Sequence, residues 1–404
     1  MDKEKKEELV NILLTRGVEN IYPSKESLKN RILTGKSMRL YCGYDPSGPT
    51  LHLGHLVSLK KLAEFQKLGH HVIMLIGDFT GMIGDPTDKT AARKKLTRDE
   101  VIKNATLYKK QATKFLSFSG KNPARIIHNS QWSDKLTFLD LIEITSNFTV
   151  QQMITRDMFQ KRLKDEKPIY LHEFLYPIAQ AYDSVAMDVD LEIGGNDQTF
   201  NMLCGRDLTK AVKGKEKYVM SLKLLIDESG KKMGKSEGNF VSLMDNPKEM
   251  FGKIMAWPDE LIIPGMELLT ESPMTEISDA KEKMSEMKIN PRDAKANLAK
   301  KIITMCYSEK EAEGAEKEFN QVFKNNDLPE NIPEIIVGNE SVPYTELVVI
   351  LNLASSKGEA KRLIIQKGVK INGQVNDRWQ EEITVNTGMV VQVGKRRFAK
   401  IIKK

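Results

Sequence analysis

The segment SGPTLHLGH, residues 47–55, holds two of the six histidines in this 404-residue chain, His52 and His55. They follow a turn with Gly48 and Pro49 and open a stretch whose leucines have helical spacing. Side chains three residues apart share one face of a helix, and a helix N-terminus attracts anions through its N–H groups and its dipole. Two imidazole donors at that position predict a phosphate site, and Gly54 leaves the backbone open to a close ligand.

Other interpretations of this motif stay open at this point. A metal site is the rival chemistry, although no carboxylate or cysteine lies nearby at ligand spacing. A pair of capping or surface histidines is the simpler alternative, because HLGH is only four residues long.

A second group of basic residues lies in KKMGKS, residues 231–236. Lys232 and Lys235 flank a small Met-Gly pair, after a predicted strand and a turn at Gly230. Two mobile ammonium groups suit a polyphosphate whose negative charge increases during bond cleavage. An exposed, lysine-rich hairpin is the alternative.

The elements around the histidines predict an α/β fold with a parallel sheet. Residues 37–45 have the pattern of a strand, residues 51–69 that of a helix, and residues 71–77 that of a strand buried on both faces. This unit predicts parallel strands with a right-handed crossover, and ligands bind beyond the carboxyl ends of such strands. Residues 134–186 and 245–325 are predicted to be mostly helical.

Positive charge is concentrated at the end of the chain. Residues 357–404 contain 12 Lys and Arg against 4 Asp and Glu, whereas the other 356 residues carry 50 basic and 51 acidic side chains. A nearly neutral body with a basic end predicts a polyanionic partner for that end. A basic surface that serves only solubility is the alternative.

The composition, 40% hydrophobic and 29% charged, is that of an ordinary globular protein. No stretch approaches the ~18 apolar residues of a membrane span, and the first ten residues mix acids with bases, unlike a targeting peptide. Cys42, Cys204 and Cys306 are scattered and form no zinc pattern. We therefore expect a cytoplasmic protein with no membrane partner.

The combination of HLGH with a later KMGKS resembles the two signature motifs of class I aminoacyl-tRNA synthetases. The segments YCGYDPSGPTLHLGH, GDFTGMIGDP, LYPIAQAYDS and IGGNDQ are similar to those of bacterial tyrosyl-tRNA synthetases, over residues 35 to 240. Near the end of the chain, SKGEAKRLIIQKGVKINGQ resembles an S4-type RNA-binding domain. KMGKS departs from the family pattern KMSKS by the loss of one hydroxyl group, and it keeps both lysines.

The resemblance implies a Rossmann-like catalytic domain over residues 1–240, with a helical insertion at about 134–186. An all-helical anticodon-side domain (241–325), a linker (326–342) and a small α+β S4-like domain (343–404) would follow. The implied enzyme activates L-tyrosine with ATP to tyrosyl-adenylate and pyrophosphate, and then esterifies the terminal adenosine of tRNA(Tyr). A homodimer is implied as well, with residues 138–175 as the contact. No metal ligands from the protein are expected, since Mg²⁺ would travel with ATP.

The same resemblance assigns roles to individual residues. The catalytic residues would be His52, His55, Lys232 and Lys235, which stabilise the transition state as a carboxylate attacks the α-phosphorus of ATP. Other ATP contacts would be Asp45, Ser47, Gly54, Lys89, Arg93, Met233 and Ser236. For tyrosine, Tyr41 and Asp183 would face the phenol, Asp85, Tyr176 and Gln180 the amino group, and Gln198 the carboxylate. RNA would meet Lys357, Lys361, Arg362, Lys367, Arg396 and Arg397.

Spacing supports part of this assignment. Tyr176, Gln180 and Asp183 are at i, i+4 and i+7, on one face of one predicted helix. Simpler alternatives remain: a solvated helix start for Lys89 and Arg93, and an ordinary strand or turn residue for Tyr41 or Asp85.

Three other functions fit parts of the sequence. A tryptophanyl-tRNA synthetase shares the fold, but Tyr41 with Asp183 and the S4-like end argue against it. An RNA-binding protein that has lost catalysis would not need both signature motifs. A nucleotidyltransferase that does not act on tRNA would have no use for a basic C-terminal domain.

Overall fold

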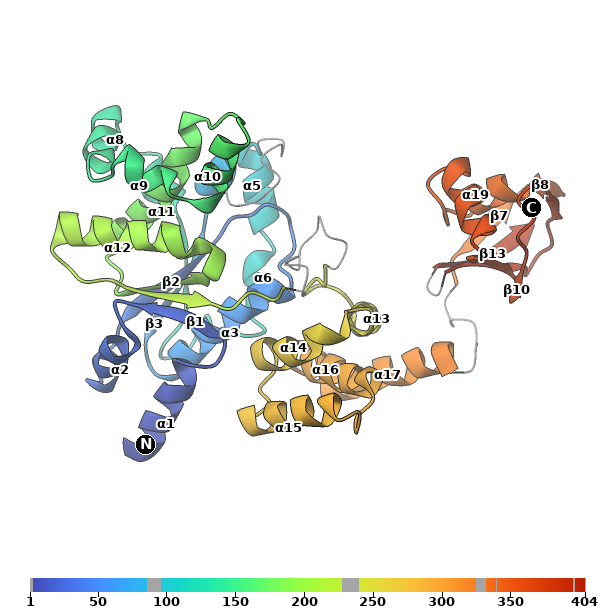
Figure 1. Cartoon of the computed structure of the whole chain (residues 1–404), viewed down its shortest axis with the longest axis horizontal. Helices are drawn as coiled ribbons and strands as arrows, with labels where there is room; N and C mark the ends of the chain where they lie inside the picture. Colours follow the sequence, from blue (N-terminus) through green and yellow to red (C-terminus); the bar gives the residue numbers. More distant parts are fainter. Residues whose placement is uncertain are drawn as a thin grey trace. The chain divides into compact units, whose positions relative to one another are not determined.

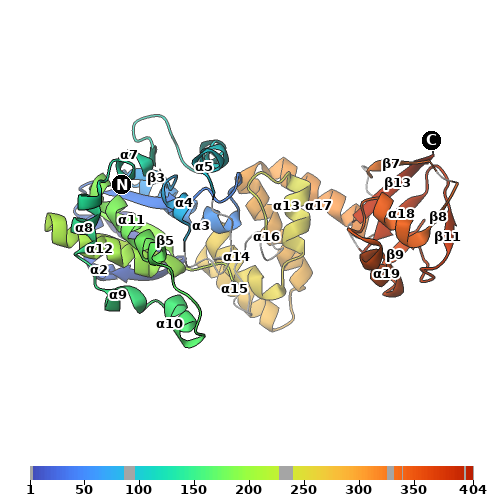
Figure 2. The same ribbon diagram turned by 90° about the horizontal axis from the view of Figure 1, so that it is seen from above.

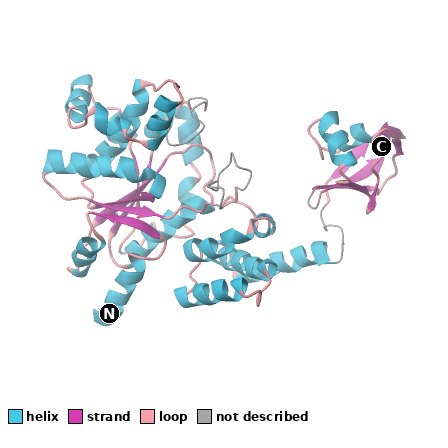
Figure 3. Ribbon diagram, viewed as in Figure 1, coloured by secondary structure: helices cyan, strands magenta, loops and turns pink. Residues whose placement is uncertain are grey.

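The structure is a computed structural model that describes residues 3–85, 96–226, 240–324, 332–338, 340–394 and 397–403. The chain divides into two compact units, Met1–Phe319 and Asn320–Lys404. The first unit contains a twisted sheet with helices on both faces, followed by a group of helices, and the second contains small sheets with helices (Figure 1 and Figure 3).

The six-stranded sheet of the first unit has the order β1-β6-β5-β2-β3-β4. Its strands are β1 (Val18–Tyr22), β2 (Arg39–Tyr44), β3 (His71–Ile76), β4 (Arg125–His128), β5 (Leu191–Gly195) and β6 (Tyr218–Leu222). Neighbouring strands are parallel except for β1 and β6, which are antiparallel. Helix α3 (Leu53–Lys67) connects β2 to β3, so the predicted parallel α/β fold is confirmed.

Alternate residues of the central strands point to opposite faces of this sheet. Residues 40, 42 and 44 of β2 join the largest apolar cluster, together with α1 (Lys3–Leu13), α2 (Lys25–Leu33) and α3. Tyr41 points to the other face, where it packs with Ile73, Leu75 and Met187. Met187 ends α11 (Leu171–Met187), which runs beside α12 (Thr199–Lys213) (Figure 2). Tyr41 therefore faces the helix that carries Tyr176, Gln180 and Asp183.

The segment between β4 and β5 is mostly helical, as predicted. It contains α7 (Ser130–Ser133), α8 (Phe138–Thr145), α9 (Val150–Ile154), α10 (Asp157–Lys164) and α11. Helices α8 and α9 each begin at a threonine whose side chain accepts a hydrogen bond from a backbone N–H of the first turn. Between β3 and β4 lie α4 (Thr80–Ile83), α5 (Arg98–Ala105) and α6 (Tyr108–Ala112).

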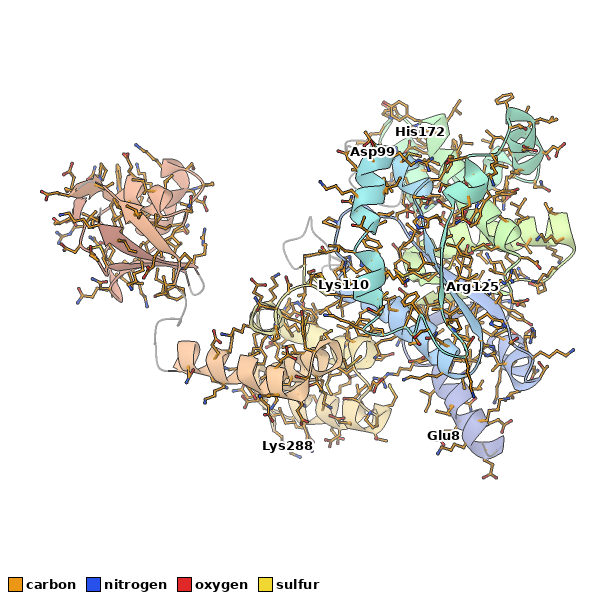
Figure 4. The ribbon with its side chains drawn as sticks, turned by 180° about the vertical axis from the view of Figure 1, so that it is seen from behind. Glu8, Asp99, Lys110, Arg125, His172 and Lys288 are labelled. Carbon is orange, nitrogen blue, oxygen red and sulfur yellow. The ribbon has the colours of Figure 1, made fainter. Side chains whose placement is uncertain are left out.

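The helices after the sheet do not form a unit of their own, although the sequence placed them in a domain at 241–325. They are α13 (Pro247–Met255), α14 (Ile262–Leu269), α15 (Met274–Ser285), α16 (Pro291–Cys306) and α17 (Glu309–Lys324). Their buried side chains belong to the same apolar cluster as α3 and the sheet. The Arg16 guanidinium also donates to the carbonyls of Glu267 (2.9 Å) and Thr270 (2.7 Å), at the end of α14. Figure 4 shows this unit from behind, with Lys110 on α6 and Lys288 between α15 and α16.

The second unit has a core of its own, formed by both of its described helices and by its strands. The helices are α18 (Tyr344–Ile350) and α19 (Lys357–Ile365). The strands are β7 (Glu334–Val337), β8 (Ser341–Pro343), β9 (Val369–Ile371), β10 (Gln374–Val375), β11 (Glu382–Thr384), β12 (Val390–Val393) and β13 (Arg397–Lys403). They form a five-stranded sheet, β10-β9-β12-β13-β7, and a pair, β11-β8. The predicted α+β character is confirmed.

No helix within the described ranges has the length and apolar character that a membrane crossing requires.

The predicted linker, residues 326–342, is wrong over its second half. Strand β7 pairs in parallel with β13, and β8 pairs with β11. The prolines and turn residues of this stretch are a local signal for a loop. The pairing depends instead on partners at residues 382–384 and 400–403, which a local pattern does not reveal.

We expect a fragment of residues 326–404 to fold alone and a fragment of residues 343–404 to be much less stable. The shorter fragment lacks Val337 and Val342, which are 3% and 2% exposed. Burying one valine contributes about 1.5–3 kcal/mol, a large share of the roughly 5–15 kcal/mol by which a domain is stable. Urea unfolding followed by circular dichroism compares the two fragments. Equal midpoints would mean that β7 and β8 add nothing to the folded domain.

Candidate active site

His52 and His55 cap the N-terminus of α3 in a way that fixes the proton on both rings. The backbone N–H of His52 donates to Nδ1 of His55 (3.1 Å), and that of Gly54 donates to Nδ1 of His52 (3.0 Å). The ring centroids are 3.9 Å apart. Because each Nδ1 accepts a hydrogen bond, Nε2 carries the proton of the neutral ring and is a donor. The cap therefore sets two N–H donors at the positive end of a helix dipole, an arrangement that suits a phosphate group.

Gly54 makes room for the first of these rings. A Cβ atom at this position would lie 2.7 Å from Cε1 and 2.9 Å from Nδ1 of His52. Both distances are shorter than van der Waals contact, so any side chain at Gly54 would displace the imidazole. The sequence suggested only that this glycine lets a ligand approach the backbone.

Residues 240–243 run alongside the start of α3. The Leu53 N–H donates to the Val241 carbonyl (3.1 Å), and the Phe240 ring meets the His52 ring edge-on, with 5.4 Å between centroids. The described chain thus returns to His52 directly after the predicted second signature. The four predicted residues of that signature, Lys232, Met233, Lys235 and Ser236, lie outside the described residues. Two further predicted ATP contacts, Lys89 and Arg93, lie outside them as well.

Asp45, beyond the carboxyl end of β2, is joined to α11 and α4. The Tyr176 hydroxyl donates to its Oδ2 (2.8 Å), and the Thr80 hydroxyl donates to its Oδ1 (2.7 Å). Burial raises the pKa of Asp45 to about 6, and these two hydrogen bonds oppose the shift. Gly77 leaves the space that the carboxylate occupies, because a Cβ there would lie 1.9 Å from Oδ1. One residue predicted to bind ATP and one predicted to bind tyrosine are therefore in direct contact.

Asp183 is a buried carboxylate, 2% exposed, with two side-chain donors. The Trp132 indole N–H donates to Oδ1 (2.8 Å), and the Asn129 amide donates to Oδ2 (3.3 Å). Burial raises the pKa of Asp183 well above its ordinary value, and both donors oppose the shift. Neither residue was among those predicted from the sequence. The signal for them is their place in HNSQW, directly after β4 at the carboxyl edge of the sheet.

Tyr41 lies in the same buried polar group, but its hydroxyl contacts Ser184 at 3.0 Å. Burial, with the charges of Glu192 and Asp183, raises the pKa of Tyr41 well above its ordinary value, so the hydroxyl keeps its proton. The Gln180 amide donates to Glu192 (2.9 Å). Ser184 and Glu192 were not among the predicted site residues.

Asp85 and Gln198 are brought together from the end of α4 and the short helix Asn196–Gln198 after β5. The Gln198 amide donates to Oδ2 of Asp85 (2.5 Å), and Asn201 donates to Gln198 (2.9 Å). The buried Arg156 guanidinium, which was not predicted from the sequence, lies 3.8 Å from Oδ1 of Asp85.

Ser47, a predicted ATP contact, is exposed in the turn after β2. Within the described residues, no three His, Cys, Asp or Glu side chains are grouped so that they could hold a metal ion.

Five of the six predicted RNA-binding residues are described, and three of them, Lys357, Lys361 and Arg362, lie on α19 of the second unit. The Lys361 ammonium lies 3.7 Å from the centroid of the Trp379 ring, and Arg362 is exposed. Three others pair with nearby acids: Lys357 with Glu346 (2.7 Å), Lys367 with Asp377 (3.8 Å) and Arg397 with Glu359 (3.8 Å). Arg396 lies outside the described residues.

Residues 33–324 match the family model of tRNA synthetases class I (W and Y), and residues 346–378 match that of the S4 domain. A relative from Haemophilus ducreyi named tyrosine–tRNA ligase is 45% identical over 392 residues, 97% of each chain. One of the same name from Moorella thermoacetica is 42% identical over 96% of this chain and 94% of its own. The chain belongs to the tyrosine–tRNA ligase family. A further tyrosine–tRNA ligase, from Thermotoga maritima, is 44% identical over 98% of this chain and 97% of its own.

Solved structures of tyrosyl-tRNA synthetases share the fold of this tyrosine–tRNA ligase family member. A C-terminally truncated mitochondrial enzyme from Coccidioides posadasii has a TM-score of 0.63 at 22% identity, over 78% of this chain and 94% of its own. An enzyme from Archaeoglobus fulgidus complexed with L-tyrosine has a TM-score of 0.59 at 22% identity, over 78% of this chain and 100% of its own. The predicted fold class is thereby confirmed.

Replacing Asp45 by asparagine should stabilise the protein at neutral pH. Burial raises the pKa of Asp45 from 3.8 to about 6, so the folded state binds this proton more tightly than the unfolded state. The resulting stability is full below pH 4 and is lost as the pH rises through about 6. Asp45→Asn cannot ionise, so it should melt at a higher temperature than the parent at pH 7.5 and at nearly the same temperature at pH 4. A variant that melts lower at pH 7.5 would show that Thr80 and Tyr176 outweigh the cost of burial.

Proposed function

We propose that this protein activates L-tyrosine with ATP, releases pyrophosphate and transfers the tyrosyl group to the terminal adenosine of tRNA(Tyr). The observation that carries the proposal is the buried Asp183 carboxylate, held by Trp132 and Asn129 in one group with Tyr41. A carboxylate out of water needs hydrogen-bond partners, and the phenol of tyrosine supplies one. Phenylalanine would leave that partner missing; tyrosyl-tRNA synthetases are themselves the usual example of this kind of discrimination.

The rest of the pocket suits the amino-acid backbone. Asp85 supplies negative charge for the ammonium group of the substrate. Tyr176 and Gln180, both on α11, are assigned as further partners of that ammonium group. The Gln198 amide donates to Asp85, and we assign it to the tyrosine carboxylate. Tyrosine binding would thus exchange hydrogen bonds within the pocket for hydrogen bonds to the substrate.

The histidines are assigned to the phosphates. As the tyrosine carboxylate attacks the α-phosphorus of ATP, negative charge moves onto the leaving pyrophosphate. Donors at Nε2 of His52 and His55 and the N-terminus of α3 stabilise that charge without forming a covalent intermediate. The motifs alone assign the same role to Lys232 and Lys235. Further ATP contacts are assigned to Asp45, Ser47, Gly54, Lys89, Arg93, Met233 and Ser236, and Mg²⁺ is proposed to arrive with ATP.

Amino-acid-dependent ATP–pyrophosphate exchange tests this function. We expect tyrosine alone to support strong exchange, with phenylalanine giving far weaker exchange and tryptophan none. A hydrogen bond to a charged group contributes roughly 1.5–3 kcal/mol, so Asp183→Ala should lower kcat/KM for tyrosine by about ten- to a hundredfold. The matched control is Asp188→Asn, five residues later at the exposed C-terminal cap of α11, which should leave exchange unchanged. Faster exchange with tryptophan than with tyrosine would make the substrate assignment wrong.

The second unit is proposed to bind tRNA. Residues 357–404 carry 12 basic against 4 acidic side chains, and charge of this kind gives salt-dependent affinity for phosphates. Truncation after Lys324 should leave pyrophosphate exchange within about twofold of the full chain, because the two units have separate cores. It should lower tRNA charging by a hundredfold or more, the order of loss expected when several phosphate contacts disappear. Parallel loss of both activities would mean that this unit only supports folding.

A homodimer is proposed from the helical insertion. Large apolar side chains are exposed there: Phe138 (78%), Leu139 (63%), Val150 (70%) and Leu171 (82%). Exposed apolar surface of this kind marks a contact with another protein, and the family resemblance makes a second copy of this chain the partner.

Phe138→Asp combined with Leu171→Asp should convert the dimer to a monomer in sedimentation velocity, because two charges would be buried unpaired. Met287→Asp is the control: this apolar residue is 94% exposed between α15 and α16, outside the insertion. A monomeric parent would overturn the proposed dimer, as would a control that dissociates equally.

We infer a reducing, cytoplasmic compartment from the cysteines. Cys42, Cys204 and Cys306 are buried free thiols. Burial raises the pKa of Cys42 and of Cys306 to about 11, so neither forms the reactive thiolate at neutral pH.

A further inference from the structure

A buried ion pair lies behind the proposed tyrosine pocket. Glu192 of β5 and Lys217, the residue before β6, are 2% and 0% exposed, and their charged groups are in contact. Lys217 also donates to Oγ of Ser184 (2.7 Å) and to the Met202 carbonyl (3.3 Å). The proposed mechanism uses neither charge, although burying each of them costs several kcal/mol before pairing offsets it.

Strand register places this pair beside Tyr41. Strands β2 and β5 are parallel neighbours in which Tyr41 is paired with Glu192, and both side chains point toward α11. From that helix, the Gln180 amide donates to Oε1 of Glu192 (2.9 Å), and the Ser184 hydroxyl donates to Oε2 (3.3 Å). Glu192 is thus connected to Gln180 directly and to Tyr41 in two ways: through Ser184, and as its neighbour across the strands, where its charge helps to raise the pKa of the Tyr41 hydroxyl.

The space for the pair is provided by Gly205 in α12. A Cβ at this position would lie 2.5 Å from Nζ of Lys217 and 2.9 Å from Oγ of Ser184. Burial lowers the pKa of Lys217, and the adjacent Glu192 carboxylate opposes the shift. Gly205 leaves room for the Lys217 ammonium group, and the Glu192 carboxylate compensates its charge in the interior.

The proton count at Ser184 limits the direction of these hydrogen bonds. Lysine can only donate, so Oγ of Ser184 accepts from Lys217 and has one proton of its own to give. When that proton goes to Glu192, the Tyr41 hydroxyl donates to Ser184 and its oxygen faces the pocket as an acceptor. When it goes to Tyr41, the Tyr41 hydroxyl donates its own proton into the pocket.

We propose that Lys217 and Glu192 are positioning residues that set the direction of the Tyr41 hydroxyl through Ser184, and thereby the discrimination of tyrosine from phenylalanine. This inference rests on the proposed tyrosine pocket. The phenol of the substrate donates its proton to Asp183 and accepts one from Tyr41. Ser184 then turns its proton from Glu192 to Tyr41, while Lys217 keeps the Glu192 charge compensated. Phenylalanine draws on none of these hydrogen bonds.

Ser184→Ala removes the connection with the smallest change in volume. It should lower kcat/KM for tyrosine in pyrophosphate exchange about tenfold, the loss expected for one hydrogen bond. The value for phenylalanine and the KM for ATP should stay within about twofold of the parent. An equal fall for both amino acids would show general damage to the site and would overturn the inference, and so would an unchanged ratio of tyrosine to phenylalanine.

The double variant Lys217→Met/Glu192→Gln removes both charges together, so that neither is left buried alone. It should produce the same selective loss for tyrosine. Added to Ser184→Ala, it should cause little further loss, because both changes act through one hydroxyl. Fully additive losses would contradict the proposed connection.

Lys295→Met is the matched control for removal of a buried lysine. Lys295 likewise contacts a carboxylate (Asp259, 2.6 Å) and a carbonyl (Trp257, 2.5 Å), in the helical region after the sheet. This variant should melt earlier and keep the parent ratio of tyrosine to phenylalanine. Tyr41→Phe in the same assay tests the tyrosine pocket separately from the role of the ion pair. If it leaves the ratio unchanged, the pocket assignment itself is wrong; if it lowers the ratio and Ser184→Ala does not, only the role of the ion pair is overturned.

Discussion

The parallel pairing of β2 with β3 and β5 is the constraint on which the site depends. It places Tyr41 between Ile73 and Glu192, on the face covered by α11. A slip of one residue would turn Tyr41 toward α1 and α3 and bring the apolar side chains of positions 40 and 42 to the pocket. The same pairing brings the ends of β2 and β3 to one edge of the sheet, where Asp45 meets Thr80. The proposed tyrosine pocket and the proposed ATP side of the site therefore depend on the same strand pairing.

Helix α11 can serve this arrangement because its two faces differ. Ile178, Ala181 and Val185 pack in an apolar cluster with α12. Gln180, Asp183 and Ser184 point instead to polar partners on the strands and the loops that follow them. Each buried polar atom on that face depends on a neighbour, so the loss of one member leaves others without a partner. The apolar clusters, and not these residues, supply the stability that permits such a face.

The sequence predicted what depends on local pattern. The βαβ unit, the histidines at the start of its helix and the shared face of Tyr176, Gln180 and Asp183 follow from spacing alone. Trp132, Ser184 and Glu192 could not be found in this way, because their importance arises from strand register and helix packing between segments far apart in the sequence. The same limitation explains why β7 was taken for part of a linker and why the helices after the sheet were separated from it.

The cation beside Glu192 fits the negative charge that Asp183 carries in the proposed tyrosine pocket. Asp183 accepts a hydrogen bond from a phenol most strongly as a carboxylate, yet burial raises its pKa and the negative charge of Glu192 raises it further. An unpaired Glu192 would therefore favour the protonated, inactive form of Asp183. The positive charge of Lys217 opposes that field while leaving the Glu192 oxygens able to accept from Gln180 and Ser184. A glutamine at this position would avoid the charge, but its amide has one acceptor oxygen, and it could not receive both hydrogen bonds on separate oxygens. The ion pair thus provides two acceptors beneath the pocket with little net charge.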